Sequence, residues 1–217
     1  MSLQITGQSQ GILSASQKSG APAAVNTGWH NEFLKSDLLP RYAYLALNGF
    51  VFSAATTTGV ALAALGTNSP IFTLWNPTGS GKNVLLLDVS LGLTTLAFAT
   101  TGITATLGTL SNTTAPTTTT PVVGVNLLLG NGNKPVAFTY SQATLAAPGP
   151  TATRHIATAA NSALATNGGQ VMCPAQLKDE VAGAIILGPG SLVSIGGEGT
   201  VADWTVVAHM TWAELPV

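Results

Sequence analysis

Strict alternation of apolar and polar residues near the end of the chain limits what it can fold into. In Ala202–Trp212, Trp204, Val206, Ala208, Met210 and Trp212 alternate with Asp203, Thr205, Val207, His209 and Thr211. Because successive side chains of a β-strand point to opposite faces, this period predicts a long strand with one buried face. Two tryptophans eight residues apart on that face predict a central position in a hydrophobic core.

A second segment, Asn83–Leu93, has the same period. We expect one face to carry Leu85, Leu87, Val89, Leu91 and Leu93, and the other to carry Asp88, Ser90 and Gly92. The residues before it, Asn-Pro-Thr-Gly-Ser-Gly at 76–81, favour a tight turn, since proline fixes φ and glycine accepts positive φ. The pattern predicts a strand, a turn and a strand.

Further strands are predicted where β-branched, aliphatic and aromatic residues lie between turn residues. They are Phe50–Ser53, Ile71–Trp75, Val122–Leu129, Pro135–Tyr140, Ala184–Leu187 and Ser191–Ile195. Glycines and asparagines at 130–133 predict that the strands on either side form a hairpin. Gly-Pro-Gly at 188–190 predicts a second hairpin, followed by a glycine-rich turn that ends at Gly199. The Thr-rich residues 111–120 and residues 146–167 are predicted loops.

Eight or more strands over about 170 residues are typical of an antiparallel β-sandwich. The long connections in the middle favour a jelly-roll-like arrangement over a closed barrel. We therefore predict an all-β fold, with a single β-sandwich domain over residues 41–217. Residues 1–40 are predicted to form an extended N-terminal arm, because Gln, Ser, Gly and Ala dominate its first part.

Apolar residues near the end of the arm recur at intervals of about four and predict one short helix that ends before Pro40. They are Trp29, Phe33, Leu34, Leu38 and Leu39. This segment either packs on its own domain or anchors the arm to a neighbouring protein. For the second role, the candidate interface residues are Trp29, Phe33, Leu34, Leu38 and Arg41.

Charged side chains are scarce in this sequence. Among 217 residues there are 7 Lys and Arg and 8 Asp and Glu, which is 7% charged, where about 25% is usual. From Tyr42 to Thr153 only Lys82, Asp88 and Lys134 carry a full charge. This composition excludes a disordered chain and argues against a nucleic-acid partner, whose phosphates require several Lys and Arg. The exposed surface is solvated by Thr, Ser and Asn or covered by other subunits, and we favour the second alternative.

The single cysteine, Cys173, excludes an intramolecular disulfide framework and fits a reducing compartment. The first ten residues lack the basic and apolar regions of a secretion signal. No apolar run approaches the length of about 18 residues that a membrane-spanning helix needs. We therefore expect a protein made in a cytoplasm, with no membrane partner.

Motifs that indicate nucleotide or metal binding are incomplete. The Gly-Ser-Gly-Lys string at 79–82 lacks the first glycine and the final Ser or Thr of a phosphate loop, and a predicted strand follows it in place of a helix. His30, His155 and His209 are isolated in sequence, so a zinc site is not expected, and His209 is expected to point outward from its strand. Metal-dependent cupins share the sandwich architecture, but their paired histidines with a glutamate are missing here.

Covalent catalysis has little support in the sequence. A catalytic cysteine requires a histidine beside it, and Cys173 has His155 and His209 as candidate partners. The residues around Cys173 instead indicate a small buried thiol at a strand end. No Gly-x-Ser-x-Gly motif sits between a predicted strand and a predicted helix. The adjacent acids Asp179 and Glu180 point apart in an extended chain, which does not suit glycoside hydrolysis. We therefore expect no enzyme activity, no cofactor and no metal.

Sugar binding without catalysis is the main non-structural alternative, because β-sandwiches commonly present aromatic side chains to glycans. Trp204 and Trp212 are assigned to the core and Trp75 to a strand, which leaves Trp29 as the free tryptophan. A glycan-binding module would therefore depend on Trp29 or on an aromatic residue of a loop.

Five segments carry a resemblance that extends from about Arg41 to the end of the chain. They are RYAY at 41–44, GFVF at 49–52, LWNPTGSGKNV at 74–84, LGPGSLVS at 187–194 and TWAELP at 211–216. In order and spacing, the chain resembles tailed-bacteriophage head decoration (cement) proteins, and the Asn-Pro-Thr-Gly-Ser-Gly loop is the most distinctive piece. The resemblance implies a β-sandwich clamped on the outside of an icosahedral head, where it stabilises contacts between capsomers without catalysis.

The expected partners are then the major capsid protein and further copies of this chain, on the outer surface of the virion capsid. Closed trimers and twofold dimers both satisfy the symmetry of such a shell, and we prefer the trimer. The alternative function is another phage surface component, such as a head fibre or tail module that binds a receptor or a glycan.

Overall fold

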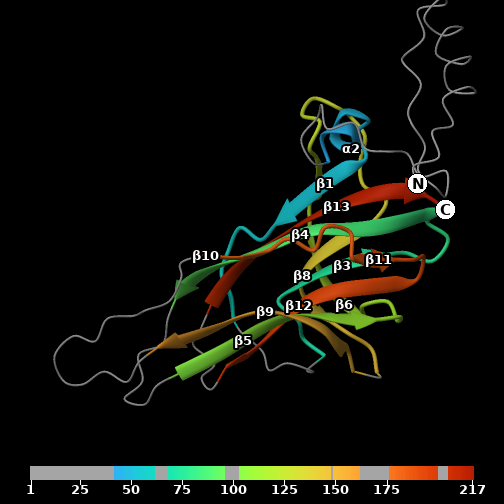
Figure 1. Ribbon diagram of the computed structural model, residues 1–217. Coiled ribbons are helices and arrows are strands. Elements are labelled where there is room, and N and C mark those ends of the chain that lie inside the picture. The colour runs from blue at the N-terminus through green and yellow to red at the C-terminus, as the bar shows by residue number, and fades with distance from the viewer. Residues whose placement is uncertain (1–41, 62–67, 96–102, 148, 162–175, 200–204) are drawn as a thin grey trace, which may run out of the picture. The chain divides into compact units, whose positions relative to one another are not determined.

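Antiparallel β-strands make up nearly all of the regular structure in the described part of the chain (Figure 1). The computed structural model describes residues 42–61, 68–95, 103–147, 149–161, 176–199 and 205–217. Within these ranges the strands pair into two antiparallel sheets, which confirms the predicted all-β sandwich. The predicted arm over residues 1–40, its short helix, Cys173 and Trp204 lie outside the described residues.

The first sheet is built around the strand predicted from the alternating C-terminal segment. Its strands are β1 (Val51–Ala55), β2 (Val60–Ala61), β4 (Lys82–Thr95), β7 (Val125–Asn126), β10 (Gln176–Asp179), β11 (Ile185–Leu187) and β13 (Thr205–Pro216). Their order is β10-β4-β13-β1-β7, with β11 also paired to β4 and β2 to β13. β13 therefore has a neighbouring strand on both sides, as expected of a central element.

The second sheet has the order β6-β8-β3-β12-β5-β9. Its strands are β3 (Phe72–Asn76), β5 (Ile103–Asn112), β6 (Thr118–Val122), β8 (Phe138–Thr144), β9 (Thr151–Asn161) and β12 (Ser191–Gly199). A short helix, α2 (Ala43–Leu47), precedes β1. The chain divides into two units after Tyr44, and the unit Leu45–Val217 contains both sheets.

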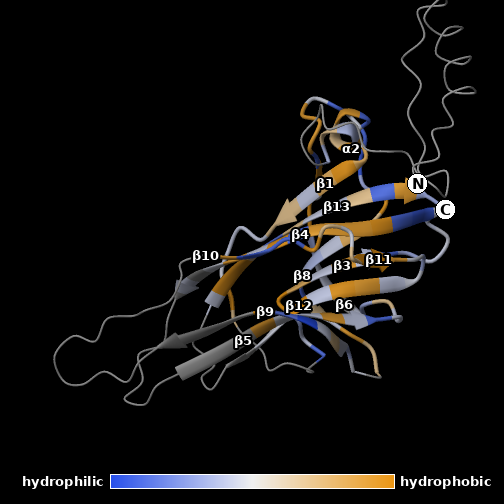
Figure 2. Ribbon diagram, in the orientation of Figure 1, coloured by the Kyte–Doolittle hydropathy of each residue, from blue (hydrophilic) through white to orange (hydrophobic). Residues whose placement is uncertain are grey.

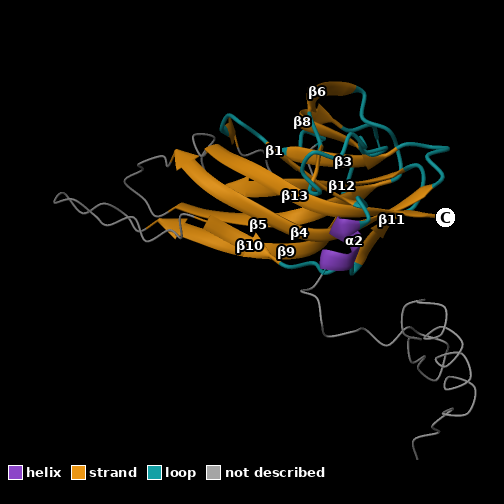
Figure 3. Ribbon diagram, turned by 90° about the horizontal axis from the view of Figure 1, so that it is seen from above, coloured by secondary structure: helices purple, strands orange, loops and turns teal. Residues whose placement is uncertain are grey.

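The strand order is that of a jelly roll. Four neighbours in the first sheet, β1-β13-β4-β10, and four in the second, β3-β12-β5-β9, reproduce the two Greek keys of an eight-stranded jelly roll. Of the remaining strands, β2 and β11 are short and pair with strands of the first sheet, and β6, β7 and β8 form an insertion between β5 and β9 that extends both sheets. Figure 3 shows β6 and β8 on the side of the sandwich opposite β9 and β10.

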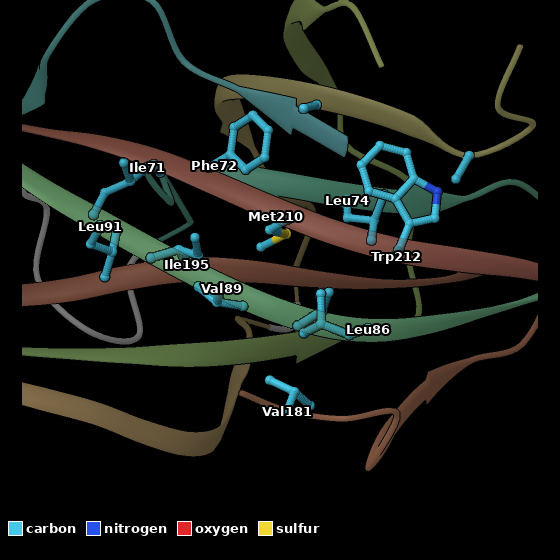
Figure 4. Packing of buried hydrophobic residues seen from close by; sticks show 14 of the residues in the cluster. Ile71, Phe72, Leu74, Leu86, Val89, Leu91, Val181, Ile195, Met210 and Trp212 are labelled. Atoms are coloured by element: carbon cyan, nitrogen blue, oxygen red, sulfur yellow. The ribbon is translucent and has the colours of Figure 1, made fainter. Parts of the chain in front are cut away.

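The hydrophobic core lies between the two sheets, where the apolar stretches of their strands meet (Figures 2 and 4). Its side chains that are at most 1% exposed include Phe72, Leu74, Val89, Leu91, Ile195, Met210 and Trp212. Trp212 also stacks on Phe52, with ring centroids 6.2 Å apart. Each such side chain contributes about 1.5–3 kcal/mol through burial. The buried face predicted for the C-terminal strand is thus confirmed for its described residues.

The predicted face of β4 is only partly right, because a bulge interrupts the alternation. The register of β13 against β4 shifts between Thr211 and Trp212, so that Leu87 is an extra residue on β4. Before the bulge, the core position belongs to Leu86, which lies opposite Trp212, and Leu85 is only half-buried on the other face. A bulge changes which residues face inward without changing the composition of the strand.

Two predicted loops contain strands. The Thr-rich tract supplies β6 from Thr118 onward, and the loop proper is 113–117. The predicted loop 146–167 contains β9. Both strands are the edges of the second sheet, where one side of the strand is unpaired and polar side chains face solvent. Threonine is β-branched and suits such an edge although it buries little.

The two predicted hairpins are also corrected. Gly-Pro-Gly at 188–190 joins β11 in the first sheet to β12 in the second, so it is a turn between sheets. The expected glycine-rich turn through Gly199 is the second half of β12. The strand predicted at Val122–Leu129 divides, since β6 ends at Val122 and pairs with β8, whereas β7 pairs with β1. A turn motif indicates where the chain reverses direction, but it does not say which sheet the next strand joins.

Candidate functional site

The five candidate interface residues from the sequence, Trp29, Phe33, Leu34, Leu38 and Arg41, lie outside the described residues. Their role stays a prediction. The described residues instead reveal an exposed apolar segment that the sequence analysis assigned to ordinary strands.

This segment lies in the insertion between β5 and β9. Six apolar side chains, which we call the apolar surface, face outward: Val123, Val125, Leu127, Leu129, Val136 and Phe138. Val123 and Leu129 are 81% and 83% exposed. The polar Asn126 between them is buried. In an isolated domain this pattern is unfavourable, and exposed apolar groups of this kind mark contacts with other molecules.

Hydrogen bonds explain why Asn126 is buried in this segment. The Asn126 amide donates to the backbone oxygen of Gly49 over 2.8 Å, and its side-chain oxygen accepts from the amide of Leu128 over 2.8 Å. The Leu127 amide donates to the backbone oxygen of Val51 over 2.9 Å. Gly49 has φ +71°, and a Cβ there would lie 2.5 Å from the Asn131 side chain. The segment is therefore fixed against the start of β1.

A buried carboxylate fixes the far end of the same segment. Glu214 of β13 is 3% exposed, and its oxygens accept hydrogen bonds of 3.0 Å from the backbone amides of Val136 and Ala137. The indole Nε1 of Trp212 is a third donor, with a hydrogen bond of 3.1 Å to Glu214 Oε1. A buried charge is tolerated where such donors surround it. The loop between β7 and β8 is thus attached to the central strand of the first sheet.

Val123 and Phe138 line a hollow of about 490 Å³, together with Pro121, Pro135 and Tyr140. The rings of Phe138 and Tyr140 stack with centroids 6.3 Å apart. Burial raises the pKa of the Tyr140 hydroxyl, so this side chain is neutral at physiological pH. An apolar hollow beside protruding aliphatic side chains suits contact with another protein surface, because both partners lose unfavourable contact with water.

A second group of residues meets on the outer face of the first sheet. His209 Nε2 lies 2.8 Å from Ser53 Oγ. The other ring nitrogen, Nδ1, lies 3.2 Å from Ser90 Oγ and 3.6 Å from Asp88 Oδ1. Asp88 Oδ2 is 3.4 Å from Lys178 Nζ. His209 faces outward from β13 as expected, but Ser53 is 156 residues away along the chain, and no motif in the sequence connects the two.

Serine, histidine and aspartate are the residues of a serine-hydrolase triad, but the surroundings do not suit that reaction. Ser53 lies within β1 between β13 and β7, so its backbone belongs to the sheet. A hydrolase instead places its serine on a tight turn beside backbone amides that stabilise the oxyanion. The 3.6 Å between Asp88 and His209 exceeds a hydrogen bond, and Ser90 is closer. The group is best described as a polar network on the sheet face.

The other sequence candidates are dispersed. The residues at 76–81 form a turn between β3 and β4, with Gly79 and Gly81 at positive φ, as the turn prediction requires. The segment that follows is a strand, so this turn is not followed by a helix N-terminus that could bind a phosphate. Asp179 pairs with Arg154, with 2.7 Å between Oδ2 and Nε. Trp75 is buried in β3, and His155 is exposed on β9.

Among the described residues, no group of three or more His, Cys, Asp or Glu side chains is placed to hold a metal ion. None of the helices in the described ranges is long and apolar enough to cross a membrane.

Comparison with known proteins adds no family to these observations. Neither models of protein families nor curated protein sequences match this chain.

Proposed function

We propose that this chain is a structural protein of a phage virion, which binds the outside of the head as a decoration protein and stabilises contacts between capsomers. In this proposal it has no catalytic activity and needs no cofactor. The apolar surface is the observation that supports the proposal best, and the resemblance of the five segments to head decoration proteins points the same way.

The apolar surface suits binding because it is held in place before a partner arrives. Glu214 and Asn126 fix its two ends to β13 and to the residues before β1. A partner therefore does not have to order this segment, and the entropic cost of association is smaller. A rigid apolar surface with few charges is what a protein needs to stay attached to a shell across a wide range of salt concentrations.

A second candidate function rests on the stacked rings of Phe138 and Tyr140. Phe138 is half-exposed beside the hollow, and jelly rolls occur in lectins as well as in viral capsid proteins. An aromatic pair of this kind also suits the face of a sugar ring, which is the chemistry of a receptor-binding head fibre or tail module.

The proposal is tested by co-sedimentation with undecorated heads from the same phage. We expect Leu129→Asp to weaken attachment by about tenfold or more, since an aliphatic contact worth about 1.5–3 kcal/mol is lost and a charge is buried. Ile186→Asp is the matched control, because Ile186 is an exposed aliphatic residue on β11, outside the apolar surface.

Wild-type protein that does not sediment with heads contradicts the proposal. Attachment that both substitutions reduce equally contradicts the role of the apolar surface. If a glycan array instead retains the wild type and loses Tyr140→Ala, the receptor-binding candidate replaces the decoration role.

A further inference from the structure

We infer that Asn131 is a site of spontaneous deamidation, in which the backbone amide of Gly132 attacks the Asn131 side chain. The reaction concerns the chain by itself and goes beyond the proposed function. Both residues belong to the loop 130–133 between β7 and β8, which the proposed attachment does not use. An asparagine followed by glycine is prone to this reaction, because glycine has no side chain to shield its amide nitrogen.

The reaction requires water as its co-reactant and no oxidant or reductant. The Gly132 nitrogen loses its proton and forms a bond to Cγ of Asn131, while the bond from Cγ to Nδ2 breaks. Nδ2 leaves as ammonia together with that proton, and a five-membered succinimide ring remains. Water then opens the ring at either of its carbonyl carbons, which produces aspartate or isoaspartate at position 131.

The side-chain carbonyl of Asn131 is held for attack by a hydrogen bond. The backbone amide of Asn133 donates to Asn131 Oδ1 over 3.0 Å. This donor stabilises the negative charge that develops on Oδ1 when a nitrogen attacks Cγ, as the amides of an oxyanion hole do. The backbone of Asn131 is also fixed, because its own amide donates to the backbone oxygen of Leu128 over 3.0 Å.

The attacking amide of Gly132 has no competing hydrogen bond. Within the described part of the chain nothing accepts from it, and Gly132 is exposed. A Cβ placed at Gly132 would meet no atom within 4 Å beyond the adjacent residues, so water reaches the amide. An exposed amide that donates no hydrogen bond loses its proton more readily than a bonded one. A held carbonyl and an unbonded amide are therefore neighbours in the chain.

A second Asn-Gly pair, Asn48–Gly49, has the same sequence but is protected. The Gly49 amide donates to the backbone oxygen of Ala46 over 2.9 Å, and Gly49 is buried. The carbonyl of Gly49 accepts from Asn126, so both backbone groups of this glycine are fixed. A third pair, Asn167–Gly168, lies outside the described residues. The structure thus distinguishes two pairs that the sequence does not.

Deamidation places a carboxylate two residues from Leu129 of the apolar surface. It makes the formal net charge of −1 more negative by one charge, and the isoaspartate form also adds a methylene group to the main chain. A charge at the rim of an apolar contact loses hydration when a partner covers it, which opposes binding. Deamidated protein should therefore attach to heads less firmly. This consequence rests on the proposed function, whereas the reaction does not.

The test is peptide mapping by mass spectrometry of the purified full chain, incubated at neutral pH either folded or in guanidinium chloride. In the folded chain we expect Asn131 to deamidate about tenfold or more faster than Asn48, since the Gly49 amide must first break a hydrogen bond. In guanidinium chloride the two rates should converge. The rate at Asn131 should also rise with pH, because the Gly132 amide must lose its proton.

Gly132→Ala is the variant that isolates the attacking amide. The fold accepts it, because the added Cβ meets no atom within 4 Å beyond the adjacent residues and Gly132 does not have a positive φ. The methyl group nevertheless crowds the attacking nitrogen, so deamidation at Asn131 should slow by about tenfold or more while Asn48 is unaffected. Circular dichroism confirms that the variant is folded.

The outcomes separate this inference from the proposed function, because the reaction is measured without heads. Equal rates at Asn131 and Asn48 in the folded chain overturn the inference, and so does a rate at Asn131 that Gly132→Ala leaves unchanged. Asn131→Asp carries the charge of the product and should sediment with heads several-fold more weakly than Asn131→Gln. Equal attachment of these two variants overturns the consequence alone. A wild type that deamidates at Asn131 but ignores heads overturns only the decoration role.

Discussion

Two apolar segments of this chain have opposite orientations. In β13, the apolar residues Val206, Ala208, Met210 and Trp212 face the core. In the segment from Val122 to Leu129, the apolar residues at odd positions face outward, and Asn126 is buried. An apolar composition therefore does not say which side of a segment is inside. In the second segment, the hydrogen bonds of Asn126 hold its polar side chain inside.

The largest expected effect is on the inward-facing segment. Trp212→Ala should lower the free energy of unfolding by about 3–5 kcal/mol, because it leaves a cavity in the core and removes a donor to Glu214. Chemical denaturation followed by circular dichroism measures the change. A decrease of less than about 1 kcal/mol in the free energy of unfolding would mean that the core tolerates the cavity. It would contradict the central role in the core that distinguishes β13 from the outward-facing segment.

A smaller effect is expected where β13 holds the loop before β8. Glu214→Gln should lower the free energy of unfolding by about 1.5–3 kcal/mol, the usual value of hydrogen bonds to a charged group. Glu214 Oε1 accepts from Ala137 and Trp212, whereas among the described residues Oε2 accepts from Val136 alone, so the new amide group turns its NH2 toward the amide of Val136. Hydrogen exchange of the Val136 amide should accelerate. If exchange stays slow while stability falls, Glu214 stabilises β13 without holding the loop.

The smallest effect concerns the polar outer face of the first sheet. Ser53→Ala should cost about 1 kcal/mol, since it removes one hydrogen bond to His209. A fluorophosphonate probe, which labels activated serines, should not label the wild type. If the probe labels the wild type but not the Ser53→Ala variant, the Ser53–His209–Asp88 group is catalytic. The protein would then have an enzyme activity in addition to the proposed decoration role.

The sequence predicts the fold better than the candidate site. Alternation and turn residues are local properties, so they locate β13, most of β4 and the turn at 76–81. The bulge at Leu87 depends on register against β13, and the two edge strands depend on their place in the sheet. The apolar surface could not be predicted from the sequence, because its orientation depends on Glu214 and Asn126. Each of them binds a backbone group 77 residues away: Glu214 the amide of Ala137, and Asn126 the carbonyl of Gly49. No local pattern contains that information.

The distance along the chain between Glu214 and the loop it fixes also affects the order of events during folding. The carboxylate belongs to β13, the last strand of the jelly roll described here, whereas the amides it binds come 77 and 78 residues earlier. Contacts between distant residues form late, because a long loop must close first. The loop therefore reaches its final shape only when the whole sandwich has closed. A half-folded chain would therefore lack the geometry of the apolar surface that the proposed attachment requires.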